Sequence, residues 1–213
     1  MEKSTNSLID HTAVFNLTYG LFLLTAKEED KDNGCIINTA VQITENPLRI
    51  TIALNKANYT HDMIINTGIF NISVLTQSVT FATFEHFGFH SGRDTDKFAD
   101  IKSPKRTTNN IIYLSEHVNA VLSARVQETV SFETHSLFIA EITESFVLAK
   151  EPSVTYQYYF DNIKPKPQPA GQTADKKKGF VCIICGYVYE GEPLPEDFIC
   201  PLCKHGAADF EPL

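Results

Sequence analysis

Short apolar segments alternate with polar turns along most of the chain. Seven segments have the length and apolar content of β-strands. They are 20–27, 35–43, 48–54, 69–75, 111–114, 117–130 and 134–149. The charged stretch 28–34 ends in Asn33-Gly34, which predicts a hairpin turn at that dipeptide.

Two helices are expected between these strands. Residues 59–67 carry Met63, Ile64 and Ile65 and are followed by Gly68, a helix stop signal. Residues 79–87 predict a second, short helix, and the polar residues 88–110 predict irregular structure. Many strands with short helices favour a mainly β fold, a closed and mostly antiparallel barrel.

The segment 161–178 interrupts this pattern. It holds three prolines, three consecutive lysines and almost no side chain to bury, which is typical of a linker. Its last 15 residues, as a flexible coil, would span about 20 Å. We therefore expect a domain at 1–160, a flexible linker at 161–178 and a second domain at 179–213.

Charge narrows the classes of partner. The chain of 213 residues has a net charge of −8, and residues 179–213 hold six acidic residues and one lysine. This balance argues against binding nucleic acid through its phosphates. The acidic charge of the second domain would favour docking to a basic partner surface. Alternatively, this charge serves only to keep the protein soluble. The chain has no signal-peptide core and no 18-residue apolar run, so we expect a cytoplasmic protein without membrane spans.

Four of the five cysteines lie in the last 32 residues, as two CxxC pairs. Cys182 and Cys185 are separated from Cys200 and Cys203 by 14 residues. Two such pairs can close a tetrahedron of thiolates around one metal ion, and the site takes zinc or iron. The remaining cysteine, Cys35, lies in an apolar segment and is expected to be a buried, inert thiol.

The residues around these cysteines help to distinguish an iron site from a zinc site. The segments 185–189 and 198–203, with Phe180 before and Phe210 after them, resemble rubredoxin over the whole of 179–213. The resemblance implies one iron in an Fe(Cys)4 centre that carries one electron. Two positions depart from the pattern: Phe198 stands where a core tryptophan is usual, and Lys204 stands where glycine is usual.

The first domain shows a second resemblance. Neither GxGxxG after a strand nor GxxxxGK[ST] occurs in it. Its segments 34–42, 54–61 and 87–98 resemble, in order, the flavin reductase-like family. That resemblance implies an FMN-binding split β-barrel with short helices and a homodimer with flavin near the subunit interface.

The family motifs imply eleven cofactor-binding residues but no catalytic residue. They are Asn38, Thr39, Gln42, Asn55, Lys56, Tyr59, Thr60, Ser91, Gly92, Arg93 and Lys97. Amides and hydroxyls suit the polar edge of an isoalloxazine ring, and a helix start suits the FMN phosphate.

Plainer interpretations of several positions stay open. Asn38 and Thr39 could simply end a strand, and Lys56 could be a solvated lysine at a helix start. Arg93 could form a surface charge network with Asp94 and Asp96. His86 and His90 could form a metal pair, although Gly88 between them argues against it.

Together the two domains resemble the fused flavoprotein–rubredoxins known as high-molecular-weight rubredoxins. The resemblance implies an oxidoreductase that passes electrons from NAD(P)H, or from a reductase, through FMN to the iron. The acceptor would be a flavodiiron protein that reduces oxygen or nitric oxide. The alternative is an NAD(P)H:flavin oxidoreductase that releases reduced flavin and has a structural zinc-ribbon tail.

Overall fold

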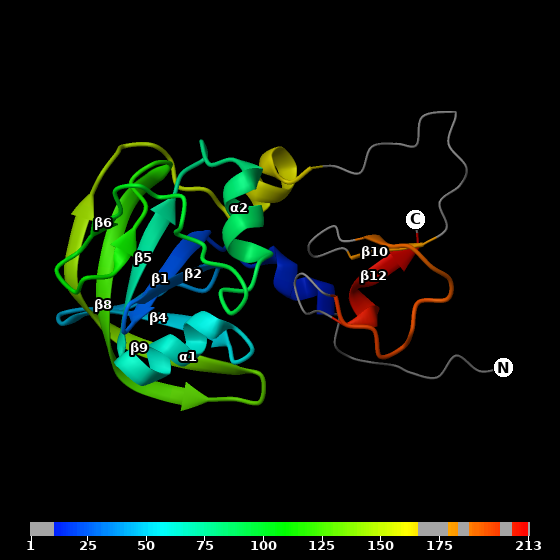
Figure 1. Cartoon of the computed structure of the whole chain (residues 1–213), viewed down its shortest axis with the longest axis horizontal. Helices are drawn as coiled ribbons and strands as arrows, with labels where there is room; N and C mark the ends of the chain where they lie inside the picture. The colour runs from blue at the N-terminus through cyan, green and yellow to red at the C-terminus, as the bar shows by residue number, and fades with distance from the viewer. Residues whose placement is uncertain (1–10, 166–178, 183–187, 201–205, 213) are drawn as a thin grey trace.

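The computed structural model describes residues 11–165, 179–182, 188–200 and 206–212 (Figure 1). Seven strands form one antiparallel sheet in the order β2-β1-β5-β8-β9-β4-β3. Their bounds are β1 Phe22–Glu28, β2 Lys31–Ile37, β3 Val41–Glu45, β4 Leu48–Asn55, β5 Ile69–Leu75, β8 Val118–Ser131 and β9 His135–Val147. The expected mainly β fold is confirmed.

The sheet curls because its two edge strands are neighbours along the chain. β2 ends at Ile37 and β3 begins at Val41, although these strands lie at opposite edges of the sheet. Four residues span at most about 14 Å of extended chain, so the two edges have to approach one another. The Thr39 hydroxyl strengthens this closure by accepting a hydrogen bond from the Ala53 N–H of β4 (3.1 Å) and donating one to the Ala53 carbonyl (2.7 Å).

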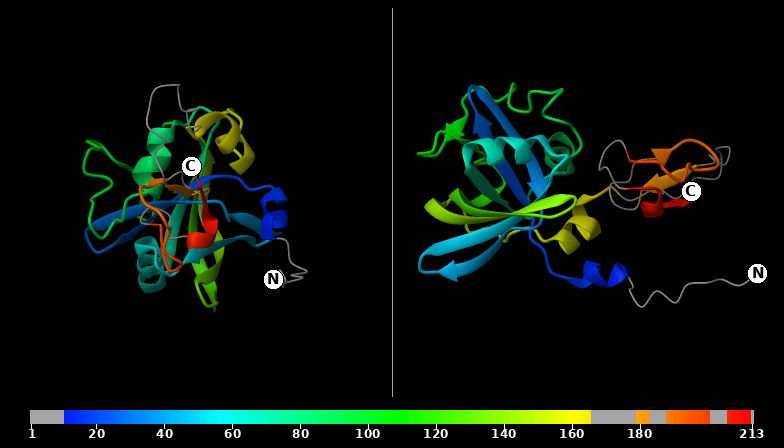
Figure 2. Two further views of the ribbon diagram at one scale, coloured as in Figure 1. Left: turned by 90° about the vertical axis from the view of Figure 1, so that its right-hand side faces the viewer. Right: turned by 90° about the horizontal axis from the view of Figure 1, so that it is seen from below.

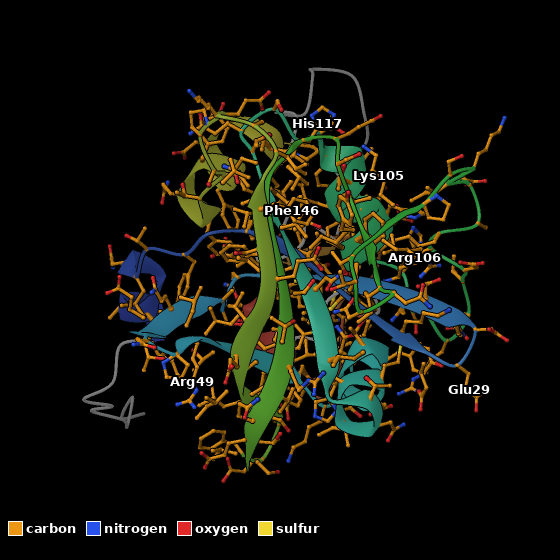
Figure 3. All side chains as sticks on the ribbon, turned by 90° about the vertical axis from the view of Figure 1, so that its left-hand side faces the viewer. Glu29, Arg49, Lys105, Arg106, His117 and Phe146 are labelled. Atoms are coloured by element: carbon orange, nitrogen blue, oxygen red, sulfur yellow. The ribbon has the colours of Figure 1, made fainter. Side chains whose placement is uncertain are left out.

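The expected turn at Asn33-Gly34 is wrong. The β1–β2 hairpin turns at Glu29 and Asp30, since Glu28 pairs with Lys31, and Glu29 has a left-handed φ of 52°. Asn33 and Gly34 lie inside β2, where Asn33 is buried. Figure 3 shows Glu29 at the hairpin tip.

Two short helices pack against the barrel. α1 spans Tyr59–Thr67 and stops at Gly68, whose φ of 70° is favourable only for glycine, and both bounds agree with the sequence-based expectation. α2 spans Phe81–Gly88. Figures 1 and 2 show the two helices at different places on the barrel surface.

Smaller elements complete the first domain. They are the 3-10 helix η1 (His11–Asn16), the two-stranded sheet β6 (Lys105–Arg106) and β7 (Ile112–Tyr113), α3 (Tyr156–Tyr158) and the π-helix η2 (Tyr159–Ile163). Arg106 holds this small sheet against β2 through two hydrogen bonds to the Asp32 carboxylate (2.8 and 2.7 Å). The ring of Phe146 on β9 packs against Tyr113 (Figure 3).

Residues 161–163, expected in the linker, belong instead to η2. The side chains of Phe160 and Ile163 pack against the buried cluster that contains Phe84 and Tyr159. The Lys164 N–H donates to the Tyr159 carbonyl at 2.8 Å, which ends the helical turn. The rest of the predicted linker, 166–178, lies outside the described residues.

Residues 180–212 contain a three-stranded antiparallel sheet in the order β11-β10-β12. β10 is Phe180–Cys182, β11 is Val188–Tyr189 and β12 is Phe210–Pro212, with the 3-10 helix η3 at Ala207–Asp209 before β12. Both CxxC motifs fall between paired segments. Val181 pairs with Val188 around the first motif, and Ile199 bridges Gly206 around the second.

Candidate functional site

A pocket opens where the end of β4, the start of α1 and the loop after α2 meet β2. Its lining combines apolar side chains with amides, hydroxyls and one ammonium group. The lining residues are Cys35, Ile36, Asn55, Ala57, Asn58, Tyr59, Phe87, Gly88, Phe89, His90, Ser91, Gly92 and Lys97. Five of the eleven predicted cofactor residues therefore line one pocket: Asn55, Tyr59, Ser91, Gly92 and Lys97.

Hydrogen bonds fix the start of α1 at this pocket. The Asn55 side chain accepts from the Ala57 N–H (2.8 Å), and the Asn58 side chain caps α1 by accepting from the Thr60 N–H (3.0 Å). The buried Thr60 hydroxyl accepts from the Asn33 amide (3.0 Å). Asn58 was missed as a site residue, although an asparagine directly before an expected helix is a recognisable N-cap signal.

Positive charge gathers at one side of the pocket. The Lys31 ammonium lies over the Tyr59 ring, 4.7 Å from its centroid, and the Arg93 guanidinium lies over the same ring, 4.8 Å from the centroid. Arg93 also donates to the Asp62 carboxylate at 2.6 Å. Arg93 is thus in an ion pair, as the surface-network interpretation held, but its partner is Asp62 and not the adjacent acidic residues of its own loop.

Lys97 is the buried cation of the site. Its ammonium donates to the Gly34 carbonyl (2.8 Å) and the Phe87 carbonyl (2.9 Å), and the residue is 4% exposed. Burial lowers the pKa of the Lys97 ammonium below its ordinary value. These contacts tie β2 to the end of α2, so Lys97 shapes the pocket wall.

Cys35 lies beside Lys97 and lines the same pocket. The thiol is buried as expected, and burial raises its pKa, while contacts with Thr60, Lys97 and Asn58 act in the opposite direction. A raised pKa keeps the sulfur protonated near neutral pH, which is the property of an unreactive thiol.

Gly92 brings the loop after α2 close to β2. A Cβ built on Gly92 would lie 2.0 Å from Oδ1 of Asn33, so only glycine fits without moving that buried amide. Ser91 caps the same loop by accepting from the Arg93 N–H at 3.2 Å. The loop therefore forms a fixed wall of the pocket.

The other predicted residues lie outside this lining. Thr39 uses its hydroxyl to bind β4, Gln42 is exposed on β3, and Asn38 follows the end of β2. The Lys56 ammonium donates to the Phe132 carbonyl in the β8–β9 hairpin, so Lys56 is not the freely solvated lysine of the alternative interpretation.

The pocket fits a flavin nucleotide by the chemistry of its wall. Ile36, Phe87 and Phe89 supply apolar surface for an aromatic ring system, while Asn55 and Asn58 supply polar contacts at the helix start. Lys31 and Arg93, over the Tyr59 ring, supply positive charge close by for a phosphate.

The second candidate site is the thiol cluster of the tail. Cys182 and Cys200, one from each CxxC motif, are both fully buried and share one apolar cluster with Phe210. Phe180, Tyr189, Leu194 and Phe198 pack around them. Cys185 and Cys203 lie outside the described residues. One buried thiol from each motif in a shared cluster fits a four-thiolate metal site.

The histidine pair does not form such a site. The His86 ring donates from Nε2 to the Lys97 carbonyl (2.7 Å), and its centroid lies 6.5 Å from that of the His90 ring. Within the described ranges, no group of three or more histidine, cysteine, aspartate or glutamate side chains is placed to hold a metal ion. No helix in the same ranges is both long and apolar enough to cross a membrane.

Comparisons with known proteins follow the division seen in the structure. The flavin reductase like domain matches residues 14–165, and the rubrerythrin, rubredoxin-like domain matches residues 180–211. A high molecular weight rubredoxin of Moorella thermoacetica is 39% identical over 95% of this chain and 99% of its own length.

Two further proteins match the first domain. A ferric-chelate reductase (NAD(P)H) of Archaeoglobus fulgidus is 30% identical over 71% of this chain and 89% of its own length. The crystal structure of an FMN-binding protein from Thermus thermophilus superposes with a TM-score of 0.58 at 16% identity, covering 68% of this chain and 79% of the other. The chain belongs to the flavin reductase-like family of oxidoreductases and carries a rubredoxin-like domain at its C-terminal end.

Proposed function

We propose that this protein is an electron-transfer flavo-rubredoxin that binds FMN in the pocket at the start of α1 and one iron at its four tail cysteines. The observation that carries the proposal is the presence, in one chain, of a pocket suited to flavin and a buried thiol from each CxxC motif in one cluster. The 39% identity to a high molecular weight rubredoxin over nearly the full length of both chains supports it.

Residues of the pocket would divide the work of binding FMN. Asn55 and Asn58, with Tyr59 and its two stacked cations, would hold the phosphate end near the start of α1. The apolar wall of Ile36 and Phe87 would contact the ring. Asn38, Thr39 and Gln42 would contact it if the ring extends past the end of β2, and Ser91, Gly92, Arg93 and Lys97 would define the opposite wall.

In the tail, Cys182, Cys185, Cys200 and Cys203 would hold the iron. When bound, the flavin supplies a centre that takes two electrons and releases them singly, while the iron carries one. The protein supplies position and exclusion of water: the aromatic side chains of Phe180, Phe198 and Phe210 surround the buried thiols. We propose that the first domain comprises 1–160 together with the η2 residues that follow, and that the rest of 161–178 joins it to the second domain at 179–213.

We infer that the protein acts as a homodimer. β3 is an edge strand whose residues are all exposed, and Val41 and Ile43 are 57% and 45% exposed on it. Apolar side chains on an exposed sheet edge are usually covered by a partner. A partner on β3 would also approach Gln42 and the β2–β3 connection. Light scattering on the purified protein measures this directly.

For the donor and the acceptor we propose NAD(P)H, or a reductase that uses it, and a flavodiiron protein. The acidic tail, with six acidic residues and one lysine, suits a partner with a basic face. A set of unoxidised thiols is stable in the reducing cytoplasm, where we place the protein.

The test is an absorption spectrum of anaerobically purified native protein with metal analysis, followed by NADH without air. Flavin bands and thiolate-to-iron charge-transfer bands that both bleach would support the proposal. Flavin bands that bleach beside a zinc-filled, colourless tail would contradict it and favour the flavin reductase that releases its product.

A further inference from the structure

Phe89 belongs to two sites at once. It follows the last residue of α2 and lines the flavin pocket. Its side chain also packs against the cluster of Cys182, Cys200 and Phe210 in the tail domain. Within the described residues of 11–165, Phe89 is the partly buried apolar residue that packs against this cluster.

The position of Phe89 is fixed from within the first domain. Its N–H donates to the Glu85 carbonyl at 3.0 Å, which ends α2. Its ring meets the Phe81 ring edge-on, with centroids 5.9 Å apart. A ring held at both backbone and side chain can present a constant apolar face to the tail domain.

Net charge provides no long-range attraction between the two domains. Residues 1–163 carry 12 basic and 19 acidic residues, and residues 179–213 carry one basic and six acidic residues. Two domains of the same sign repel weakly at long range. Apolar burial at Phe89 supplies attraction at their contact, and one aromatic side chain buries far less area than a stable interface requires. A contact of this size would orient the tail domain and would still be able to open.

The contact lies where electron transfer between the two domains would require it. Electron transfer falls off steeply with the distance between the centres, so the tail thiols have to approach the flavin. Phe89 forms part of the wall of the flavin pocket and packs against the cluster that contains two tail thiols. A tail domain docked on Phe89 therefore holds these thiols close to the flavin pocket. An opened tail would then be available to an external acceptor.

We propose that Phe89 is the reversible docking point of the rubredoxin-like domain at the mouth of the flavin pocket. The role of this contact in electron transfer rests on the proposed function, whereas the contact itself can be tested without any electron transfer.

The experiment compares X-ray scattering of the full-length protein, loaded with flavin and metal, in four forms: wild type, Phe89→Ser, Phe89→Leu and Val147→Ser. Phe89→Ser is expected to open the protein and raise its radius of gyration. Phe89→Leu keeps apolar contact and should stay near the wild type. Val147→Ser is the matched control, because Val147 is an apolar side chain that is 77% exposed at the end of β9.

A kinetic measurement on the same samples completes the test. Reduction of the iron after the flavin is reduced should slow about tenfold in Phe89→Ser, the effect of losing roughly 1.4 kcal/mol of contact energy. If Phe89→Ser releases flavin, scattering of flavin-free wild type and variant gives the same comparison. An unchanged radius of gyration in Phe89→Ser would overturn the docking point. A second outcome separates the two proposals. If Phe89→Ser raises the radius of gyration but reduced flavin never reduces the iron in the wild type, the docking point stands and the proposed relay is overturned.

Discussion

At the scale of single residues, Cys35 is informative because its sulfur is buried next to the charged Lys97. Burial raises the pKa of the Cys35 thiol from an ordinary 9.0. Above pH 9.0 the unfolded chain loses this proton while the folded chain keeps it, so the free energy of unfolding falls as pH rises from 9.0 toward the raised value.

Cys35→Ala should remove this part of the alkaline destabilisation. The difference in unfolding free energy between the wild type and Cys35→Ala is expected to be constant up to about pH 9. It should then decline by at most about 1.4 kcal/mol per pH unit. Urea unfolding at several pH values between 7 and 10.5 measures it, and the tail cysteines cancel in the comparison. A difference that stays constant throughout would contradict the raised pKa.

Two glycines of the pocket make a second test at this scale. Gly92→Ala should destabilise the protein by about 1–3 kcal/mol, because its Cβ would overlap the Asn33 amide that also holds Thr60. Gly88→Ala is the control, since its Cβ would meet Ile36 at an ordinary 3.6 Å and alanine favours a helix. Denaturant midpoints compare the two; equal midpoints would show that the loop moves freely away from β2.

At the scale of elements, α1 joins the barrel to the proposed phosphate site. Asn58→Ala should cost about 1 kcal/mol of stability, because the Thr60 N–H loses its cap. Asn58→Asp keeps a capping oxygen, so its stability should remain near the wild type, but it adds negative charge where we place the phosphate. FMN affinity, measured by fluorescence titration, should therefore fall in Asn58→Asp. An unchanged FMN affinity in Asn58→Asp would show that the phosphate does not bind at the start of α1.

The elements also show how far the sequence could predict the structure. Helix 59–67 and strand 69–75 were predicted with their observed bounds, because apolar periodicity and Gly68 mark them locally. The β1–β2 turn was not, since the turn signal Asn33-Gly34 is overridden by burial of Asn33 against Thr60. Tertiary contacts determine the register of the β1–β2 hairpin, and a local sequence pattern cannot predict such contacts.

The site followed the same division. The motif segments predict cofactor-binding residues at the start of α1 and in the loop 91–97, and the structure brings five of these residues into the lining of one pocket. The burial of Lys97, held by two backbone carbonyls, could not be predicted, because a lysine in a polar segment usually faces solvent. The role of Phe89 depends on contact between segments about 90 residues apart, which sequence spacing does not encode.

At the scale of the whole molecule, we expect the stability of the tail to depend on its proposed metal more than on its apolar core. Its described core holds few large apolar side chains: Phe180, Tyr189, Leu194, Phe198 and Phe210 around Cys182 and Cys200. A domain of about 35 residues rarely folds without a metal or disulfides. The barrel, by contrast, has two large buried clusters of its own. Removing the metal should therefore unfold the tail and leave the barrel folded.

Cys200→Ser tests this independence together with the relay. Loss of one thiolate should abolish the iron absorption and the thermal transition of the tail, while FMN stays bound and the barrel transition is unchanged. Transfer to an external acceptor should stop, because in the proposed relay the iron of the tail carries the electrons of the flavin to that acceptor. Val147→Ser serves as the control, since it changes an exposed barrel residue outside the flavin pocket and leaves the four tail cysteines intact. Undiminished transfer in Cys200→Ser would mean that electrons leave directly from the flavin, and the tail would then have no part in the relay.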